Sequence, residues 1–198
     1  MRYLIVCGGK IDKEFGLNEI KTDGIDAIIA ADSGMDFLYE NGVTPDIIVG
    51  DFDSVTTKAL EFFERKGQTE IHRLNPIKDD TDTEYAIRLA IREGARSIVM
   101  LGATGSRIDH VLGNISLLGM GLESKADISI IDTNNRIRMA DKPVTIEKSA
   151  QYGRFVSLIA VTDDNEVSLR GFKYPVIDYS FDRFTSLGIS NEIIDDHA

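Results

Sequence analysis

Four short, uninterrupted apolar runs, separated by segments with helical periodicity, constrain the fold of this chain more than any other feature of its sequence. Continuous apolar runs are typical of strands that a parallel sheet buries on both faces, because neither side of such a strand meets water. The runs occupy residues 4–6, 27–30, 47–49 and 98–101. They predict the central strands of a mainly parallel sheet.

Helical patterns lie between these runs. Apolar residues recur at helical spacing in residues 87–91, and Gly94 after them is a typical C-terminal stop. Residues 108–115 repeat the pattern, and residues 55–66 form another predicted helix. Strands that alternate with helices indicate a doubly wound α/β domain.

The pattern changes after a predicted turn at residues 132–135, beyond which helical periodicity fades. A hairpin turn is predicted at residues 162–165. The strands predicted in this part are residues 144–147, 155–161 and 166–169. We therefore predict an α/β domain over residues 1–133 and a small all-β domain over residues 134–198.

The composition excludes several classes of partner. The chain carries 22 basic and 33 acidic residues, a net charge of −11, which argues against nucleic acid because phosphate backbones require basic stripes. No stretch approaches the roughly 18 apolar residues of a membrane span, and the N-terminal run is too short for a signal-peptide core. Cys7 is the only cysteine, so no intrachain disulfide forms, which fits a reducing cytoplasm.

Ligands of open parallel sheets bind beyond the carboxyl ends of the strands. Each of the four apolar runs is followed there by glycine, aspartate or hydroxyl residues. Taken singly, these segments are explained as tight turns or helix caps, and none matches a known phosphate-loop fingerprint. Their convergence on one edge of the sheet instead favours a site for phosphate and metal.

A pair of aspartates follows the third run. In an extended segment Asp51 and Asp53 point the same way while Phe52 turns toward the core. Two carboxylates this close repel each other unless a cation lies between them. A helix cap explains one of them but not both.

A denser acidic cluster lies at residues 78–84. Thr81 and Glu84 match a capping box, and acids at a helix N-terminus are favoured by the helix dipole. This structural explanation does not require Asp79, Asp80 and Asp82 together. The surplus indicates a second element that binds Mg²⁺ or supplies a base.

The segment 102–110 joins a glycine-rich turn to an arginine and an aspartate at a predicted helix start. Backbone N–H groups of such a turn bind phosphate, and Arg107 binds it bidentately. Asp109 is within reach of a metal in this arrangement. His110 is ambiguous between a structural and a catalytic role, and no zinc-type spacing accompanies it.

These motifs, in this order, resemble those of bacterial thiamine pyrophosphokinases. The matching segments are residues 50–54, 79–84, 102–110, 171–175 and 188–192. The resemblance runs over nearly the whole chain. It implies an α/β catalytic domain that binds ATP and Mg²⁺, followed by a β-sandwich domain that binds thiamine. It also implies a homodimer with the thiamine site between subunits, and the conversion of ATP and thiamine to AMP and thiamine diphosphate.

The motif residues receive roles on this basis. The expected metal ligands are Asp51, Asp53, Asp79 and Asp82, and the catalytic group comprises Asp51, Asp53, Asp80 and Asp109, of which Asp80 or Asp109 accepts the hydroxyl proton. The expected ATP-phosphate contacts are Lys78, Gly102, Thr104, Gly105 and Arg107. The resemblance places Ser190 and Asn191 near the thiamine pyrimidine, although the residues alone fit a simple β-turn.

Three other functions use the same acidic and glycine-rich motifs. A pyrophosphokinase for another heterocyclic alcohol, such as a pterin, differs in the segment 188–192. A metal-dependent phosphoesterase releases free phosphate without an acceptor. A nucleotide sensor, whose β domain binds a partner, binds ATP without forming AMP.

Overall fold

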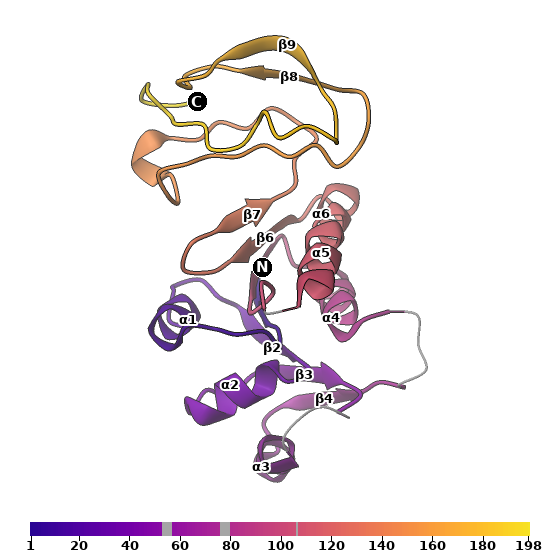
Figure 1. Cartoon of the computed structure of the whole chain (residues 1–198). Coiled ribbons are helices and arrows are strands. Elements are labelled where there is room, and N and C mark those ends of the chain that lie inside the picture. Colours follow the sequence, from indigo (N-terminus) through magenta and orange to yellow (C-terminus); the bar gives the residue numbers. More distant parts are fainter. Residues whose placement is uncertain (53–56, 76–79, 106) are drawn as a thin grey trace. The chain divides into compact units, whose positions relative to one another are not determined.

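A computed structural model describes residues 1–52, 57–75, 80–105 and 107–198 of the chain (Figure 1). The predicted site residues Asp53, Lys78 and Asp79 lie outside this described part. The chain divides into two compact units, Met1–Asp141 and Lys142–Ala198.

The first unit is built on a seven-stranded sheet with the order β4-β3-β2-β1-β5-β6-β7. The neighbouring pairs from β4 to β6 are parallel, and β7 runs antiparallel to β6. The four predicted strands are confirmed as β1, β2, β3 and β5, whereas β4, β6 and β7 were not predicted. The strands are β1 (Arg2–Val6), β2 (Ala27–Ala31), β3 (Ile47–Gly50), β4 (Glu70–Arg73), β5 (Ser97–Leu101), β6 (Asp127–Ile131) and β7 (Arg136–Arg138).

Helices cover both faces of this sheet, as the doubly wound prediction requires (Figure 1). Alternate residues of β1 enter opposite cores: Ile5 packs in the core under α4 to α6, and Leu4 packs in the core under α1 to α3. One face carries α1 (Lys13–Ile20), α2 (Gly34–Glu40) and α3 (Thr57–Lys66); the other carries α4 (Asp82–Arg92), α5 (Ile108–Leu117) and α6 (Gly119–Ser124).

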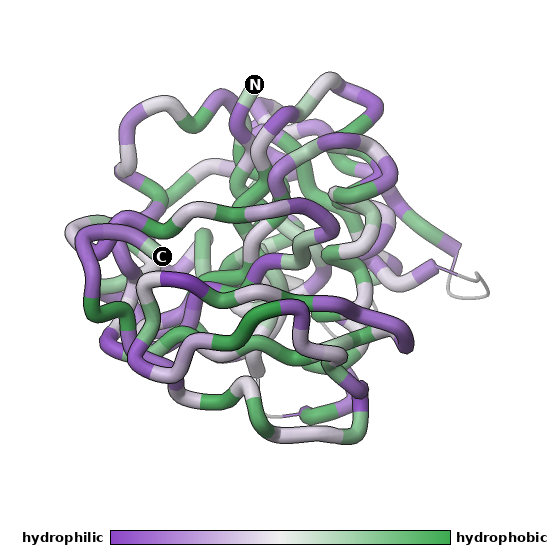
Figure 2. Tube along the Cα trace, turned by 90° about the horizontal axis from the view of Figure 1, so that it is seen from above, coloured by the Kyte–Doolittle hydropathy of each residue, from purple (hydrophilic) through white to green (hydrophobic). Residues whose placement is uncertain are grey.

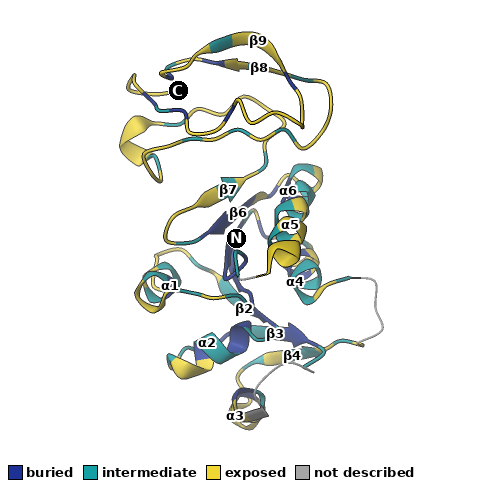
Figure 3. Ribbon diagram, viewed as in Figure 1, coloured by how far each residue is buried: buried dark blue, intermediate teal, exposed yellow. Residues whose placement is uncertain are grey.

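The buried residues of the first unit concentrate in its central strands (Figure 3). Ile5, Val6, Ile48 and Ile98 are fully buried, which explains why these strands read as unbroken apolar runs. Along the coloured parts of the trace, hydrophobic and hydrophilic stretches alternate (Figure 2).

The division between the units falls after Asp141, eight residues later than the predicted boundary at 133/134. The predicted turn at residues 132–135 is real, but it is the loop of the β6–β7 hairpin. Asp132 Oδ1 accepts hydrogen bonds from the backbone N–H groups of Asn134 and Asn135 at 2.8 and 2.7 Å. The turn chemistry therefore ends a strand within the sheet and does not end the unit.

The second unit pairs its backbone antiparallel. It contains β8 (Asn165–Leu169), β9 (Val176–Phe181) and a short 3₁₀ helix, η1 (Lys148–Ala150). The predicted strand at 166–169 lies within β8. The predicted strands at 144–147 and 155–161 are not regular strands: they form the isolated bridges Glu147–His197 and Val156–Asn191, with a few neighbouring backbone hydrogen bonds. The overall fold class, a mainly parallel α/β unit followed by a small antiparallel β unit, is confirmed.

Candidate active site

Three aspartates from three different elements meet at the carboxyl edge of the sheet. Asp32 follows β2, Asp51 follows β3, and Asp82 is the first residue of α4. One carboxylate oxygen from each residue lies within 4.8 Å of the other two, and all three residues are half-buried. Like charges at this distance repel each other. Oxygen atoms from carboxylates are the ligands that Mg²⁺ takes in proteins, so this carboxylate group fits a divalent cation.

Backbone geometry brings Asp32 beside Asp51. The Asp32 N–H donates to the Val49 carbonyl at 2.8 Å, which joins the ends of β2 and β3. Asp32 also has a left-handed backbone, with φ of 50°, which redirects its carboxylate after the strand. Such a conformation costs a non-glycine residue on the order of 1 kcal/mol, and its position in the carboxylate group suggests a functional reason for that cost.

Phe52 also has a left-handed backbone, with φ of 64°. The backbone at Phe52 is therefore not extended as predicted, and Asp53, the second member of the predicted pair, lies outside the described residues. The Phe52 ring packs over Gly50, where an added Cβ would lie 3.0 Å from a ring carbon. The Arg73 guanidinium covers the ring at 5.3 Å from its centroid. The chain thus turns sharply after Asp51.

The first turn of α4 is tied to two strands of the sheet. Burial raises the pKa of the Cys7 thiol to about 12, although a hydrogen bond with Thr83 opposes this rise. The buried thiol is therefore neutral near pH 7. On the other side, the Tyr85 hydroxyl is hydrogen-bonded to His72 Nδ1 at 3.1 Å. Both contacts lie within one turn of Asp82 and hold it in place.

The capping box predicted at α4 forms only in part. The Thr81 hydroxyl accepts a hydrogen bond from the Glu84 N–H at 3.2 Å. The Glu84 carboxylate does not complete the box, because it pairs with Arg88 at 2.6 Å. Asp80 also pairs with Arg88, at 3.4 Å, and it is not a member of the carboxylate group.

The glycines at the ends of β1 and β5 pack against each other. The Gly9 N–H donates to the Gly102 carbonyl at 3.0 Å, and a Cβ built on Gly9 would overlap that oxygen. Gly102 has φ of 69°, and a Cβ on Gly105 would lie 3.0 Å from Gly9 Cα. Close approach between the chain's own loops therefore accounts for these glycines in this structure.

Arg107 and Asp109 bind each other at 2.6 Å. This hydrogen bond, with another from the His110 N–H, lowers the pKa of Asp109 to about 2. Asp109 is thus a poor proton acceptor near neutral pH, and it lies outside the carboxylate group. Both side chains are exposed, so the ion pair is open to exchange with another anion.

The two predicted thiamine contacts in the second unit have different surroundings. Ser190 is exposed and has φ of 61°. Asn191 is 5% exposed, and its side chain exchanges hydrogen bonds with the Tyr174 backbone at 2.9 and 3.1 Å. Its amide oxygen also accepts from the Glu192 N–H at 3.0 Å. Asn191 therefore ties together the two C-terminal motif segments.

The structure thus brings together Asp51 and Asp82 among the predicted metal ligands. It adds Asp32, which follows the second apolar run and was not named among the predicted ligands. The available signal was its place directly after an apolar run, on the same edge as the other acids. Ser33, at the N-cap position of α2, makes no side-chain cap hydrogen bond.

Fold and site together define a class of protein: an open, doubly wound α/β unit with a carboxylate group at its carboxyl edge, followed by a small antiparallel β unit. None of the helices in the described ranges combines the length and apolarity that a membrane crossing requires.

Comparisons with known proteins narrow this class. A family model described as "Thiamin pyrophosphokinase, catalytic domain" matches residues 21–131, and one described as "Thiamin pyrophosphokinase, vitamin B1 binding domain" matches residues 143–198. Thiamine pyrophosphokinase from Bacillus subtilis is 36% identical over 168 residues, which cover 84% of this chain and 78% of that protein.

Solved structures agree. A crystal structure of the Bacillus subtilis thiamine pyrophosphokinase matches with a TM-score of 0.88 and 32% identity, covering 100% of this chain and 92% of the other. A thiamin pyrophosphokinase from Geobacillus thermodenitrificans matches with a TM-score of 0.82 and 30% identity, covering 100% and 90%. The chain belongs to the thiamine pyrophosphokinase family and is an enzyme of that kind.

Proposed function

We propose that this enzyme transfers the β,γ-diphosphate of ATP to the hydroxyl of thiamine in a Mg²⁺-dependent reaction, giving thiamine diphosphate and AMP. The observation that carries the proposal is the carboxylate group of Asp32, Asp51 and Asp82, placed where open α/β sheets bind ligands. The names of the matching family model and of the Bacillus subtilis relative point to the acceptor, thiamine.

Asp32, Asp51 and Asp82 are the proposed Mg²⁺ ligands, directly or through water. Asp53 and Asp79 remain proposed ligands on sequence grounds. When bound, the ion would neutralise phosphate charge, which a protein of net charge −11 otherwise repels.

In the proposed transfer, the thiamine hydroxyl oxygen forms a bond to the β-phosphorus. The bond from that phosphorus to the oxygen bridging the α-phosphorus breaks, and AMP leaves with the electron pair. The hydroxyl proton passes to a carboxylate. The low pKa of Asp109 argues against it, so we propose Asp80 for this role.

Phosphate contacts are proposed for Lys78, Gly102, Thr104, Gly105 and Arg107. Arg107 has the strongest support, because its exposed guanidinium is held by an equally exposed carboxylate, and a phosphate can replace that partner bidentately. Lys78 is proposed on sequence grounds.

Thiamine is proposed to contact the second unit at Ser190 and Asn191. The hydroxyl of exposed Ser190 suits this role, whereas the Asn191 amide is committed to the backbone and would position the segment. We also propose a homodimer with the thiamine site between subunits, and a cytoplasmic location that suits the unpaired thiol of Cys7.

The test is an incubation of the purified protein with Mg²⁺, ATP and thiamine, with AMP and thiamine diphosphate followed by chromatography. Equal amounts of both products, formed only when thiamine is present, are expected. Free phosphate without an acceptor would identify a phosphoesterase instead. Binding of ATP without AMP formation would identify a sensor, and AMP formation only with a pterin alcohol would change the acceptor.

A further inference from the structure

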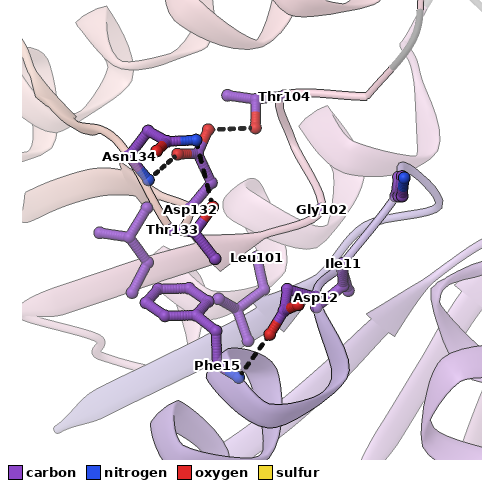
Figure 4. A pocket seen from close by; sticks show the side chains of 11 residues that line it. Ile11, Asp12, Phe15, Leu101, Gly102, Thr104, Asp132, Thr133 and Asn134 are labelled. Atoms are coloured by element: carbon purple, nitrogen blue, oxygen red, sulfur yellow. Dashed lines mark hydrogen bonds between the residues drawn. The ribbon is translucent and has the colours of Figure 1, made fainter.

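The side chains at the two ends of the carboxyl edge are held in place by different contacts. Beside β5 and β6, hydrogen bonds fix them: the Thr104 hydroxyl donates to Asp132 Oδ2 at 2.6 Å, and the β6–β7 turn donates two backbone N–H groups to the other oxygen (Figure 4). Beside β3 and β4, an aromatic ring and a guanidinium pack next to Asp32 and Asp51 instead.

The ring belongs to Phe52, and it packs against the backbone that carries two of the carboxylates. A Cβ built on Gly50 would lie 3.0 Å from a carbon of the Phe52 ring and 3.3 Å from Asp32 Cα. The ring and the Asp32 backbone therefore border the same small space beside Gly50. Since Gly50 directly precedes Asp51, a shift of the ring would disturb the positions of both aspartates.

Arg73 covers this ring from the neighbouring strand. It is the last residue of β4 and the register partner of Gly50 in β3, and its guanidinium carbon lies 5.3 Å from the centroid of the Phe52 ring. A guanidinium at this distance is attracted to the face of a ring. The Glu64 carboxylate on α3 forms an ion pair with the same guanidinium. The ring is thus in contact with Gly50 and is held there by Arg73.

This part of the edge needs such support. Asp32 and Phe52 both have left-handed backbones, with φ of 50° and 64°, a conformation that is unfavourable for residues other than glycine. One carboxylate oxygen from each of Asp32, Asp51 and Asp82 lies within 4.8 Å of the other two, and their repulsion favours any movement that separates them. A contact that keeps the ring in place therefore opposes the spreading of the carboxylates.

We propose that Arg73 and Phe52 are positioning residues for the metal site: the guanidinium holds the ring, and the ring keeps Asp32 and Asp51 at the spacing that a divalent cation requires. Neither side chain offers a carboxylate oxygen to the ion, so both act through the aspartates. The Arg73 side chain is exposed, so it adds little to the packing of the core. The proposal rests on the proposed Mg²⁺ dependence and extends it to two residues outside the carboxylate group.

The charge of Arg73 allows a test by the sign of the effect. A positive charge near a cation site repels the cation, so an effect of charge alone predicts that removal of the guanidinium strengthens cation binding. Loss of positioning predicts weaker binding. Arg73→Met keeps an unbranched side chain beside the ring but removes the charge and the ion pair with Glu64. Phe52→Leu removes the flat ring without changing any charge, and Phe52→Tyr keeps the ring.

The first readout is the binding of Mn²⁺ alone, followed by the electron paramagnetic resonance signal of the free ion in the absence of ATP and thiamine. Arg73→Met and Phe52→Leu are each expected to raise the Mn²⁺ Kd about two- to fivefold, the range that an exposed cation–π contact supplies. The double variant is expected to match the weaker single variant, because both changes break one contact. Phe52→Tyr is expected to bind as the wild type does. Melting temperatures in EDTA show whether each variant is folded.

Arg183→Met is the matched control. Arg183 makes the same two kinds of contact in the second unit: its guanidinium carbon lies 5.1 Å from the centroid of the Phe184 ring, and its Nε pairs with Asp163 at 3.0 Å. The second unit supplies none of the three carboxylates. The control is therefore expected to keep the Mn²⁺ affinity of the wild type.

Unchanged or tighter Mn²⁺ binding by folded Arg73→Met would overturn the proposal, as would fully additive effects of the two changes. A higher ATP KM with an unchanged Mn²⁺ affinity would also overturn it and would make Arg73 a phosphate contact instead. Failure of the proposed function has a different signature. A wild type that binds no Mn²⁺ and turns over without a divalent cation would remove the metal site itself, whereas a wild type that binds Mn²⁺ no better than the variants would remove only the positioning role.

Discussion

At the scale of single residues, the carboxylate group lowers the stability of the fold in a way that serves the proposed function. Asp32, Asp51 and Asp82 hold three like charges within 4.8 Å, an arrangement that is unfavourable without a cation and useful with one. The left-handed backbone of Asp32 adds to that cost. Residues of this kind are expected to be replaceable for folding and essential for turnover.

The variant Asp32→Asn tests whether this carboxylate is needed for turnover but not for folding. We expect turnover to fall at least a hundredfold, since the change removes a metal-binding charge at the proposed centre. In EDTA, the melting temperature is expected to equal or exceed that of the wild type, because one repulsive charge is gone. Added Mg²⁺ is expected to stabilise the wild type more than the variant.

The control is Asp23→Asn, an exposed aspartate in the connection before the amino end of β2, which is expected to leave activity and Mg²⁺ response unchanged. Turnover near that of the wild type in Asp32→Asn would remove Asp32 from the metal site. Differential scanning fluorimetry and the product assay give the two measurements.

A second residue-scale prediction concerns pH. The hydrogen bond from Arg107 holds the pKa of Asp109 at about 2, below its usual 3.8. A depressed carboxyl pKa contributes stability above the unfolded pKa and loses it as the pH falls toward 2. Above pH 4 Asp109 stays ionised. Any acidic limb in the pH profile of kcat above pH 4 is therefore expected to persist, at the same midpoint, in Asp109→Asn. Disappearance of that limb would restore Asp109 as the base.

At the scale of elements, the position of α4 determines where Asp82 lies. The Tyr85 hydroxyl binds His72, and His72 Nε2 binds Glu70 at 2.6 Å. This chain of contacts ties the helix to the edge strand β4. Losing these contacts would not remove the Asp82 carboxylate. Their loss is therefore expected to weaken metal binding more than it slows the transfer step.

Tyr85→Phe removes only the hydroxyl that makes this contact. We expect the Mg²⁺ concentration for half-maximal activity to rise a few-fold while kcat at saturating Mg²⁺ changes little, because the hydrogen bond contributes about 1 kcal/mol. Tyr39→Phe on α2 is the control, as Tyr39 makes ring contacts with Phe62 and Phe63. An unchanged Mg²⁺ requirement in Tyr85→Phe would show that α4 is positioned without this contact.

In the second unit, the Asn191 side chain holds two backbone segments together through hydrogen bonds. Its amide joins the segments around Tyr174 and Glu192 and is almost fully buried. Asn191→Ala is expected to cost about 1–3 kcal/mol in the free energy of unfolding, because it leaves backbone groups without partners. Ser190→Ala is expected to keep stability and to raise the thiamine KM more than the ATP KM. Chemical denaturation and steady-state kinetics measure both, and equal stability of the two variants would contradict the assignment.

At the scale of the whole molecule, the second unit has a small hydrophobic core. Its buried apolar residues are few: Leu169, Phe172, Phe181 and Ile193. Most of this unit is coloured as exposed in Figure 3. Its exposed large apolar side chains include Phe155, Ile159, Ile177 and Phe184. Small units with so little core require further burial, and exposed apolar patches mark interaction surfaces.

We therefore expect a homodimer in solution, with about twice the 21.9 kDa mass of one chain. Light scattering after size exclusion measures this mass. The double variant Ile159→Asp, Phe184→Asp is expected to lower the dimer fraction, and to lower thiamine turnover if the site lies between subunits. A monomer at micromolar concentration in the wild type would contradict the expectation, and Lys142→Asp provides an exposed-position control.

The sequence by itself determined the elements whose signals are local. Apolar runs specified the buried strands, helical periodicity specified α4 and α5, and paired acids pointed to Asp51 and Asp82. Each of these signals depends on neighbours within a few residues, where spacing alone sets which face a side chain occupies. The strands β4 and β7 were not predicted because they lack such a local pattern. Both lie at the sheet edges, are half exposed and contain no apolar run.

The tertiary structure decided which distant residues meet. Asp32 joins Asp51 because β2 and β3 are neighbours in the sheet, and Asp82 joins them because α4 packs back over the sheet. Asp80 and Asp109, the two candidate bases, lie outside the carboxylate group, and each is paired with an arginine. The turn at residues 132–135 stays in the first unit because β7 returns to pair with β6. Such partnerships depend on strand order and on competing contacts, which no local pattern encodes.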